Sequence, residues 1–388
     1  MEPFTLLVKP SGSDCNIDCR YCFYKDRSPE FGQGRQRMSV QVLEKLVKDY
    51  IQLGFAVVGF AWQGGEPTLM GVDFFRRAVQ LQKEYGKEGQ QISNTLQTNG
   101  LLLDDQWCRF FHDSNFLLGI SIDGPKEFHD YYRVDGGGSG TFDRVMRAIK
   151  SCKNHQVEFN ALILLNNRNV EHTDELFDFL VENDITYLQF IPCIEIDPAT
   201  GRPADFSITP EKYGDFLCRL FDRWYQYGPE KLNIREFDSL VTYLVMGSHT
   251  ICTYSKQCAG FVVIEHTGDA FCCEFFVEPK WRLGNILETP LDKLTGSSKK
   301  RTFARAKQNL CNKCIVCRYL DVCRGGCMKD RVRLNKDSPS SQSYFCEGCK
   351  QFFDYTMPRF MQIAAAIKNG SAGRHTRPAE RVRLHIRK

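Results

Sequence analysis

The chain has 388 residues, of which 42% are hydrophobic and 25% are charged, and its formal net charge is +4. This length suits about two domains with buried cores, no apolar run reaches the roughly 18 residues of a membrane span, and the N-terminus lacks the segments of a signal peptide. The 18 cysteines are therefore expected to serve metal or redox chemistry in the cytoplasm, and extracellular disulfides are a poor explanation for them.

The positive charge is concentrated in the last 21 residues. Residues 368–388 hold seven basic side chains and one acid, so this segment carries +6 and the rest of the chain carries −2. A charge confined to a tail does not indicate a nucleic-acid-binding body. We expect the tail to be disordered.

The first half of the chain alternates apolar, β-branched runs with amphipathic stretches. The expected strands are Phe4–Val8, Val57–Trp62, Leu96–Thr98, Leu117–Ile122, Phe159–Leu165 and Tyr187–Ile191, and the expected helices are Val40–Leu53, Val72–Tyr85, Asp104–Asp113, Phe142–Cys152 and Thr173–Asn183. Strands separated by helices predict βαβ units and a parallel sheet. The fold class is thus α/β, a partial (β/α)6 barrel of the TIM type, with a doubly wound sheet as the alternative. In both folds, catalytic groups gather at the C-terminal ends of the strands.

The pattern changes along the second half. A connector over residues 194–250 is expected to hold two helices, Pro210–Tyr227 and Arg235–Met246. Beyond it the strands shorten and cysteines become dense, with a hairpin over Val262–Phe276 and a helix over Gln351–Lys368. We therefore expect a barrel domain with linker helices over 1–235, a cysteine-rich domain over 236–367 and the basic tail over 368–388.

Three cysteines, Cys15, Cys19 and Cys22, directly follow the first expected strand. Three thiolates on one loop can hold three irons of a [4Fe–4S] cluster and leave the fourth open to another ligand, whereas a closed cluster has four thiolates. On spacing alone, a zinc site lacking its fourth ligand or three buried thiols are alternatives. We favour the cluster because structural zinc rarely occupies the mouth of a β/α barrel.

The segment Cys15–Cys22 resembles the signature of the radical S-adenosylmethionine (SAM) superfamily, in which SAM chelates the open iron and is cleaved to a 5′-deoxyadenosyl radical. The segment Gln63–Pro67 resembles that family's Gly-Gly-Glu motif, in which glycine backbone and Glu66 meet the SAM amine. The resemblance further implies SAM contacts from Tyr21, Gly65, Ser121, Arg133 and Leu188, with Arg133 pairing with the SAM carboxylate.

A second set of cysteines occupies the last third of the chain. Its spacing resembles the SPASM pattern, a domain that carries auxiliary iron–sulfur clusters in peptide-modifying radical SAM enzymes. The resemblance assigns one [4Fe–4S] cluster to Cys252, Cys258, Cys273 and Cys327, and a second to Cys314, Cys317, Cys323 and Cys346. On spacing alone the Cys-x-x-Cys pairs suit zinc equally well. Cys311 and Cys349 are rival members of the second set.

Segments from about residue 4 to residue 365 resemble anaerobic sulfatase-maturating enzymes, among them Leu7–Pro10, Leu96–Gly100 and Lys280–Ile286. Those enzymes oxidise a cysteine or serine of a sulfatase to Cα-formylglycine. The resemblance implies three [4Fe–4S] clusters and SAM as cofactors. It also implies a sulfatase segment of the Cys/Ser-x-Pro/Ala-x-Arg type as substrate, a flavodoxin- or ferredoxin-type reductant, and no nucleic-acid or membrane partner.

One position departs from that family. The relatives carry aspartate, the presumed base, directly after the hairpin cysteine, and here the residue is Glu274. The extra methylene adds roughly 1.5 Å of reach, and a misplacement of about 1 Å is costly in catalysis. Tyr24 resembles a tyrosine that contacts the substrate.

The change to Glu274 keeps a second hypothesis open. In this hypothesis, the protein is a SPASM radical SAM enzyme that installs thioether or carbon–carbon crosslinks in another ribosomal peptide. A third hypothesis, outside the enzymes, is a binding scaffold stabilised by zinc.

Overall fold

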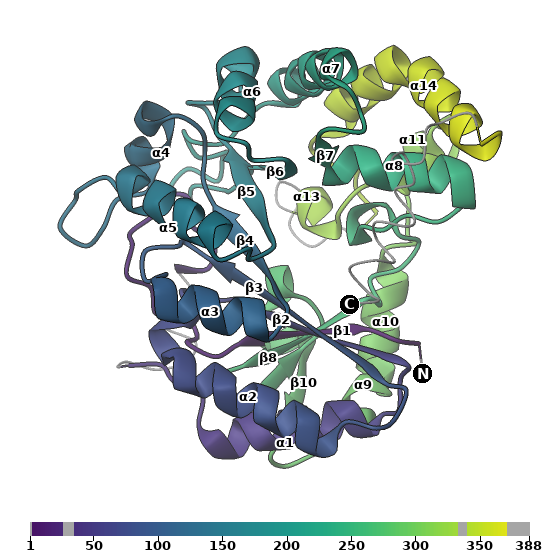
Figure 1. Cartoon of the computed structure of the whole chain (residues 1–388). Coiled ribbons are helices and arrows are strands. Elements are labelled where there is room, and N and C mark those ends of the chain that lie inside the picture. The colour runs from purple at the N-terminus through teal and green to yellow at the C-terminus, as the bar shows by residue number, and fades with distance from the viewer. Residues whose placement is uncertain (1, 26–34, 333–339, 371–388) are drawn as a thin grey trace. The chain divides into compact units, whose positions relative to one another are not determined.

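The computed structural model describes residues 2–25, 35–332 and 340–370 (Figure 1). The chain divides into two compact units: Met1–Ser121, His129–Phe159 and Cys258–Arg305 form the first, and Ile122–Phe128, Asn160–Gln257 and Ala306–Lys388 form the second. The domain boundaries expected at residues 235 and 367 stay a prediction. The basic segment 371–388 lies outside the described residues, so its expected disorder also stays a prediction.

The first unit contains a mostly parallel sheet with the strand order β10-β9-β8-β1-β2-β3-β4. Its strands are β1 (Thr5–Lys9), β2 (Val57–Trp62), β3 (Gln91–Thr98), β4 (Phe116–Ser121), β8 (Phe261–Glu265), β9 (Asp269–Phe271) and β10 (Arg282–Asn285). Strand β3 begins earlier than the expected strand at Leu96, because its first residues are mostly polar and the apolar pattern does not include them. Among them, Asn94 is buried, accepts a hydrogen bond from Trp62 Nε1 (2.9 Å) and exchanges two with Gln82 of α2.

The main helices of the first unit are α1 (Val40–Gln52), α2 (Val72–Tyr85), α3 (Asp105–Asp113) and α5 (Phe142–Asn154). They follow one another along the sheet, each in contact with the next (Figure 1). Side-chain caps start two of them: Ser39 accepts from the Val42 amide and Asp104 from the Trp107 amide, as helix N-termini require. The shorter elements are α9 (Leu291–Thr295), α10 (Ser298–Ala306), η2 (Pro67–Met70), η4 (Glu274–Phe276) and η5 (Pro279–Trp281), and the short helix α4 (Lys126–Tyr132) is divided between the two units.

Strands β8 and β9 form the predicted hairpin, and β8 also pairs in parallel with β1. Thr5 lies opposite Phe261, and Lys9 lies opposite Glu265. Apolar side chains seal this junction in one buried cluster, comprising Leu7, Val263, Phe271 and Val277. The pairing places the residues that follow β8 at the same edge of the sheet as the cysteine loop that follows β1.

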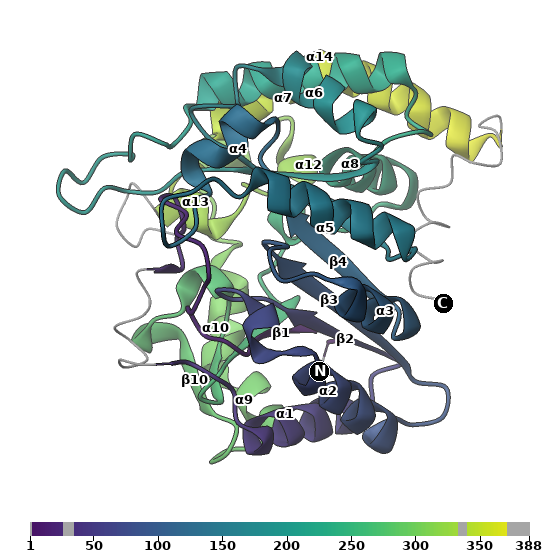
Figure 2. The same cartoon turned by 60° about the vertical axis from the view of Figure 1, so that its left-hand side comes forward.

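The second unit contains the parallel strands β5 (Phe159–Leu165), β6 (Tyr187–Pro192) and β7 (Asn233–Ile234). Its long helices are α6 (Thr173–Glu182), α7 (Pro210–Tyr227), α8 (Arg235–Met246) and α14 (Cys346–Lys368). Helix α14, yellow in Figure 2, packs along α7 and also contacts α8. The short elements η3 (Cys252–Tyr254), α11 (Asn312–Ile315), α12 (Leu320–Cys323) and α13 (Met328–Val332) lie in or beside the cysteine-bearing segments.

The six predicted strands and the alternation of strands with helices are present, which confirms the α/β fold class. Helix α14 begins at Cys346, five residues before its predicted start. Across the ranges that the structure describes, every helix is too short or too polar to cross a membrane.

Candidate active site and cysteine sites

The loop after β1 carries Cys15, Cys19 and Cys22. The segment Val134–Asp135 holds it: the Asp18 amide donates to Val134 O (2.7 Å), and Ile17 forms a β-bridge with Asp135. Within the loop, the Cys22 amide donates to Cys19 O (3.2 Å), and this turn keeps these two cysteines close together. The three thiols thus share one short, fixed loop.

Two side chains donate toward the sulfur atoms of this loop. Asn99 Nδ2, just past β3, lies 3.7 Å from Cys15 Sγ, and Arg133 Nη1 lies 4.0 Å from Cys19 Sγ. Although Cys15 is exposed overall, the protein around its thiol desolvates it and raises its pKa to about 12, and the nearby Glu66 carboxylate adds to the rise. A thiolate at this position therefore needs a compensating cation. Soft thiolates with hydrogen bonds to sulfur fit an iron–sulfur cluster.

The glycine motif after β2 binds the cysteine loop through its backbone. The Gly65 amide donates to Gly12 O, and the Glu66 amide donates to Asp14 O, both at 2.8 Å. A Cβ atom on Gly65 would lie 2.0 Å from Asp14 O. Only glycine permits this approach of two backbones, so the motif and the loop form one assembly.

Glu66 is fully buried and ties this assembly to the end of β3. Its Oε1 accepts from the Thr68 amide (3.0 Å), Thr68 Oγ1 (2.6 Å) and Thr98 Oγ1 (2.8 Å), and its Oε2 accepts from the Asn99 amide (2.8 Å). Burial raises the pKa of this carboxyl, and the four hydrogen bonds oppose the rise. These contacts favour a positioning part for Glu66; its expected contact with SAM stays a prediction.

The other expected SAM contacts lie in three places. Arg133 is buried beside the cysteine loop, with its guanidinium 5.5 Å from the ring centre of Tyr21. Ser121 is the last residue of β4 and is half-buried. Leu188 is buried in β6, which belongs to the second unit. The structure thus brings Tyr21 and Arg133 together with Cys19.

The expected base lies beside the glycine motif. Glu274 begins η4, directly after Cys273, and its Oε2 accepts a hydrogen bond from Gln63 Nε2 at 2.8 Å. The Gln63 amide in turn donates to Val8 O of β1 (2.9 Å). Gln63 has no role in the sequence-based prediction, although it directly precedes the Gly-Gly pair that could have pointed to it.

Tyr24 lies in a buried, charged group. Its hydroxyl donates to both carboxylate oxygens of Glu265 (2.6 Å each), and Lys9 Nζ lies 3.4 Å from its ring centre. Lys9 and Glu265 are 1% and 0% exposed. Sequence reasoning missed both, although each is a charged residue that ends a buried apolar strand. The Tyr24 hydroxyl is engaged with protein here, and its expected contact with the substrate stays a prediction.

Replacing Tyr24 by phenylalanine is expected to destabilise the protein. The change removes a donor from a buried carboxylate, which costs about 1–3 kcal/mol. The readout is the free energy of unfolding in urea, and the control is Tyr131→Phe, at a tyrosine that is 52% exposed. Equal stability of the two variants would contradict this account of the Tyr24–Glu265 contact.

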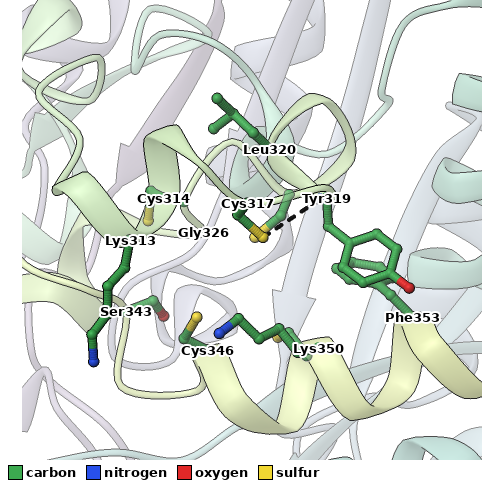
Figure 3. A pocket seen from close by; sticks show the side chains of 13 residues that line it. Lys313, Cys314, Cys317, Tyr319, Leu320, Gly326, Ser343, Cys346, Lys350 and Phe353 are labelled. Carbon is green, nitrogen blue, oxygen red and sulfur yellow. Dashed lines mark hydrogen bonds between the residues drawn. The ribbon is translucent and has the colours of Figure 1, made fainter.

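The second unit contains a pocket whose wall is rich in sulfur. Cys314 and Cys317 come from α11 and the turn after it, Cys323 from the end of α12, and Cys346 and Cys349 from the first turn of α14. In Figure 3 the labelled cysteines reach toward a common space, and the dashed line joins the Tyr319 amide to Cys317 Sγ (3.4 Å). Cys311 Sγ lies outside this lining, 3.6 Å from Cys314 Sγ. The donor set therefore fits an iron–sulfur cluster.

The remaining expected cluster ligands lie in different places. Cys258 and Cys273 belong to the first unit, where the Cys258 amide donates to Ala304 O (3.1 Å). Cys252, in η3, and Cys327 belong to the second unit. Within the described ranges, no three His, Cys, Asp or Glu side chains are grouped so as to hold a single metal ion.

Both Cys346 and Cys349 line the pocket, and iron content can show which of the two is the cluster ligand. Cys346→Ala is expected to lose between one and about four irons per chain, because one iron of a closed cluster would lack its thiolate. Cys349→Ala is expected to retain them. Iron and sulfide analysis after anaerobic purification measures both. The reverse result would exchange the ligand assignment of the two residues.

Comparisons with known proteins agree with this geometry. A family model described as the Radical SAM superfamily matches residues 10–180, and one described as an iron–sulfur cluster-binding domain, SPASM, matches residues 252–318. The fold and the cysteine sites therefore define a radical SAM protein with a SPASM domain.

Individual relatives narrow the class. A serine-type anaerobic sulfatase-maturating enzyme of Bacteroides thetaiotaomicron is 36% identical over 96% of this chain and 94% of its own length. A cysteine-type enzyme of Clostridium perfringens is 36% identical over 95% of this chain and 100% of its own. A solved structure of native anSMEcpe with bound AdoMet and a peptide matches with a TM-score of 0.87 and 35% identity, covering 94% of this chain and 99% of that one. The chain belongs to the anaerobic sulfatase-maturating enzymes.

A more distant match shows the fold alone. Streptococcus suis SuiB bound to S-adenosylmethionine matches with a TM-score of 0.60 at 17% identity, covering 89% of this chain and 75% of that one.

Proposed function

We propose that the protein is a radical SAM oxidoreductase of the cytoplasm that converts a cysteine or serine of a sulfatase chain to Cα-formylglycine. The observation that carries the proposal is the Gln63–Glu274 hydrogen bond (2.8 Å), because it joins the expected base to the glycine motif beside the cysteine loop. The family relatives, both serine-type and cysteine-type, support the same activity.

The residues that would hold the cofactors follow from the three cysteine sets. Cys15, Cys19 and Cys22 would hold the cluster that binds SAM, with Tyr21, Gly65, Ser121, Arg133 and Leu188 as SAM contacts. Cys252, Cys258, Cys273 and Cys327 would hold a first auxiliary [4Fe–4S] cluster, and Cys314, Cys317, Cys323 and Cys346 a second. When bound, these groups supply the one-electron chemistry that removes a hydrogen atom from the substrate Cβ and takes up the second electron.

The chain's own residues handle the proton and the alignment. Glu274 takes the proton of the substrate thiol or hydroxyl. Its Oε2 is fixed by Gln63, and no described residue bonds its Oε1, which is therefore available as the accepting atom. Gln63 is itself anchored to β1 through Val8 O, so the base is held on the sheet rather than on a loose loop. Arg133, beside Cys19, provides a cation for the SAM carboxylate.

The test uses reduced protein with reconstituted clusters, SAM and two synthetic peptides. One carries Cys-x-Pro-x-Arg and the other carries serine in place of the cysteine, and a peptide with alanine at that position is the control. The expected result is an aldehyde on at least one target residue, shown by mass spectrometry and capture with a hydrazide. SAM cleavage without aldehyde on either peptide would overturn the substrate assignment.

That second outcome would favour the crosslinking alternative, which the longer Glu274 side chain motivates. Its substrate would be a different ribosomal peptide. Both activities would use a one-electron donor of the flavodoxin or ferredoxin type. A new thioether or carbon–carbon bond in such a peptide, with no action on sulfatase peptides, would establish it.

A further inference from the structure

Two cysteines outside the three proposed cluster sets lie side by side in the first unit. Cys108, on α3, and Cys152, on α5, have their Sγ atoms 3.9 Å apart, and both residues are 0% exposed. The two sulfur atoms of a disulfide are about 2.05 Å apart, so an approach of roughly 1.9 Å would bond this pair. The two thiols are therefore placed for disulfide formation.

A chain of hydrogen bonds leads from Cys108 to the surface. The Cys108 thiol donates to Ser151 Oγ (3.4 Å), and the Ser151 hydroxyl donates to Asp105 Oδ1 (3.1 Å). The side chain of Asp105 is 71% exposed, and its Oδ1 also lies 3.0 Å from His155 Nε2. A proton released by Cys108 thus has a hydrogen-bonded route to solvent, and we expect a small oxidant to enter on the same side.

The surroundings make the two thiols chemically different. The hydrogen bond with Cys152 lowers the pKa of Cys108, burial opposes this effect, and Ser151 and the charge of His155 add to the lowering. The contact with Cys108 and burial both raise the pKa of Cys152. Cys108 therefore loses its proton first, while Cys152 keeps its proton and stabilises the thiolate. A thiolate next to a thiol is the arrangement found in redox-active dithiols.

The two helices of the pair follow two supports of the cysteine loop. Asn99, whose side chain donates toward Cys15 Sγ, lies just before α3. Arg133, whose guanidinium donates toward Cys19 Sγ, lies before α5. Cys108 and Cys152 are 44 residues apart in the chain. A covalent link between α3 and α5 would therefore restrain both supports at once.

We propose that Cys108 and Cys152 form a peroxide-sensitive dithiol that closes to a disulfide between α3 and α5. The Cys108 thiolate attacks one oxygen of hydrogen peroxide, the O–O bond breaks, and the sulfur becomes a sulfenic acid. The departing hydroxide takes up the proton that Cys108 released and forms water. The Cys152 sulfur then attacks the Cys108 sulfur, the S–O bond breaks, and a second water leaves. Two thiols are thus oxidised, one peroxide is reduced, and none of the proposed cluster ligands takes part.

The experiment adds hydrogen peroxide in graded amounts to the reconstituted wild-type protein under nitrogen, after small thiols have been removed. Remaining thiols are alkylated, and tryptic peptides are analysed by mass spectrometry. Trypsin leaves Cys108 in residues 88–109 and Cys152 in residues 151–153, each with one cysteine. A linked peptide therefore identifies this disulfide, and dithiothreitol is expected to reverse it. Iron content is measured on the same samples.

The internal reference is Cys218, a half-buried cysteine of α7 whose pKa burial raises to about 11. Because reactivity follows the thiolate fraction, we expect the pair to be half oxidised at a peroxide concentration at least about tenfold below the one that modifies Cys218. A linked peptide that forms only after iron has been lost, or only together with modification of Cys218, would overturn the proposal.

Cys152→Ser tests the order of the two steps, with Cys218→Ser as the matched control. We expect the Cys152→Ser protein to form no linked peptide and to hold a sulfenic acid on Cys108 that dimedone traps. The Cys218→Ser protein is expected to form the disulfide as the wild type does. An unmodified Cys108 in an iron-loaded Cys152→Ser protein would remove Cys108 as the attacking thiol. The wild-type titration needs no variant and decides the proposal if Cys152→Ser does not fold.

Discussion

Glu274→Gln is expected to lower peptide oxidation by about 10²–10⁴-fold, the usual contribution of a general base, while SAM cleavage and iron content remain at wild-type levels. The amide is close in size to the carboxylate and can still accept from Gln63, but it cannot take up the substrate proton. The measurement is the rate of aldehyde formation beside the rate of SAM cleavage in the same reaction. Loss of the first without the second separates the base from the cofactor sites.

The control for this variant is Glu288→Gln, at an exposed carboxylate of the same unit. Glu274→Asp adds a second comparison, because it shortens the side chain by one methylene to the family residue. Full activity of Glu274→Asp would show that the pocket tolerates both lengths. Wild-type oxidation by Glu274→Gln would remove Glu274 from the mechanism.

Gly65→Ala is expected to reduce SAM cleavage by about 10²-fold or more, even without peptide, because a displacement of about 1 Å in a catalytic assembly has that cost. The new Cβ would lie 2.0 Å from Asp14 O and 2.7 Å from the carbonyl carbon of Ser13. Both are backbone atoms, so the cysteine loop and the glycine motif must separate. The hydrogen bonds of Gly65 and Glu66 to that loop would be lost with them.

Gly136→Ala is the matched control, since a Cβ there meets no atom within 4 Å. SAM cleavage is measured as 5′-deoxyadenosine formed per cluster, with iron content determined on the same samples. A Gly65→Ala protein that cleaves SAM at the wild-type rate would show that the close approach of the two backbones is dispensable.

Local sequence patterns predict most of the fold. Apolar runs and amphipathic periods locate the six strands and the long helices to within a few residues, apart from the polar start of β3. That start is invisible to hydrophobic pattern because Asn94 is buried through side-chain hydrogen bonds, not through apolar contact. Likewise, the first turn of α14 holds cysteines that line a pocket. The residues of this turn lack the amphipathic period from which a helix could be predicted.

The candidate site is predictable only in part. Cysteine and glycine motifs are sequence signatures, so their loops could be named in advance. The contacts of Gln63 with Glu274 and of Tyr24 with Glu265 depend on the parallel pairing of β1 with β8, whose residues are about 256 positions apart. Nothing in the local sequence specifies a strand's partner at that distance.

That pairing has a consequence for biosynthesis. β1 leaves the ribosome well before β8, which follows it by about 256 residues, and Leu6 and Val8 in β1 are fully buried in the finished protein. Until residues 261–265 are made, β1 has no neighbour on one side and is an open, apolar sheet edge, which is a site for aggregation. Contacts of such long sequence separation also form slowly. We therefore expect nascent or truncated chains that end before β8 to depend on chaperones, and the catalytic edge to assemble only after most of the chain has been synthesised.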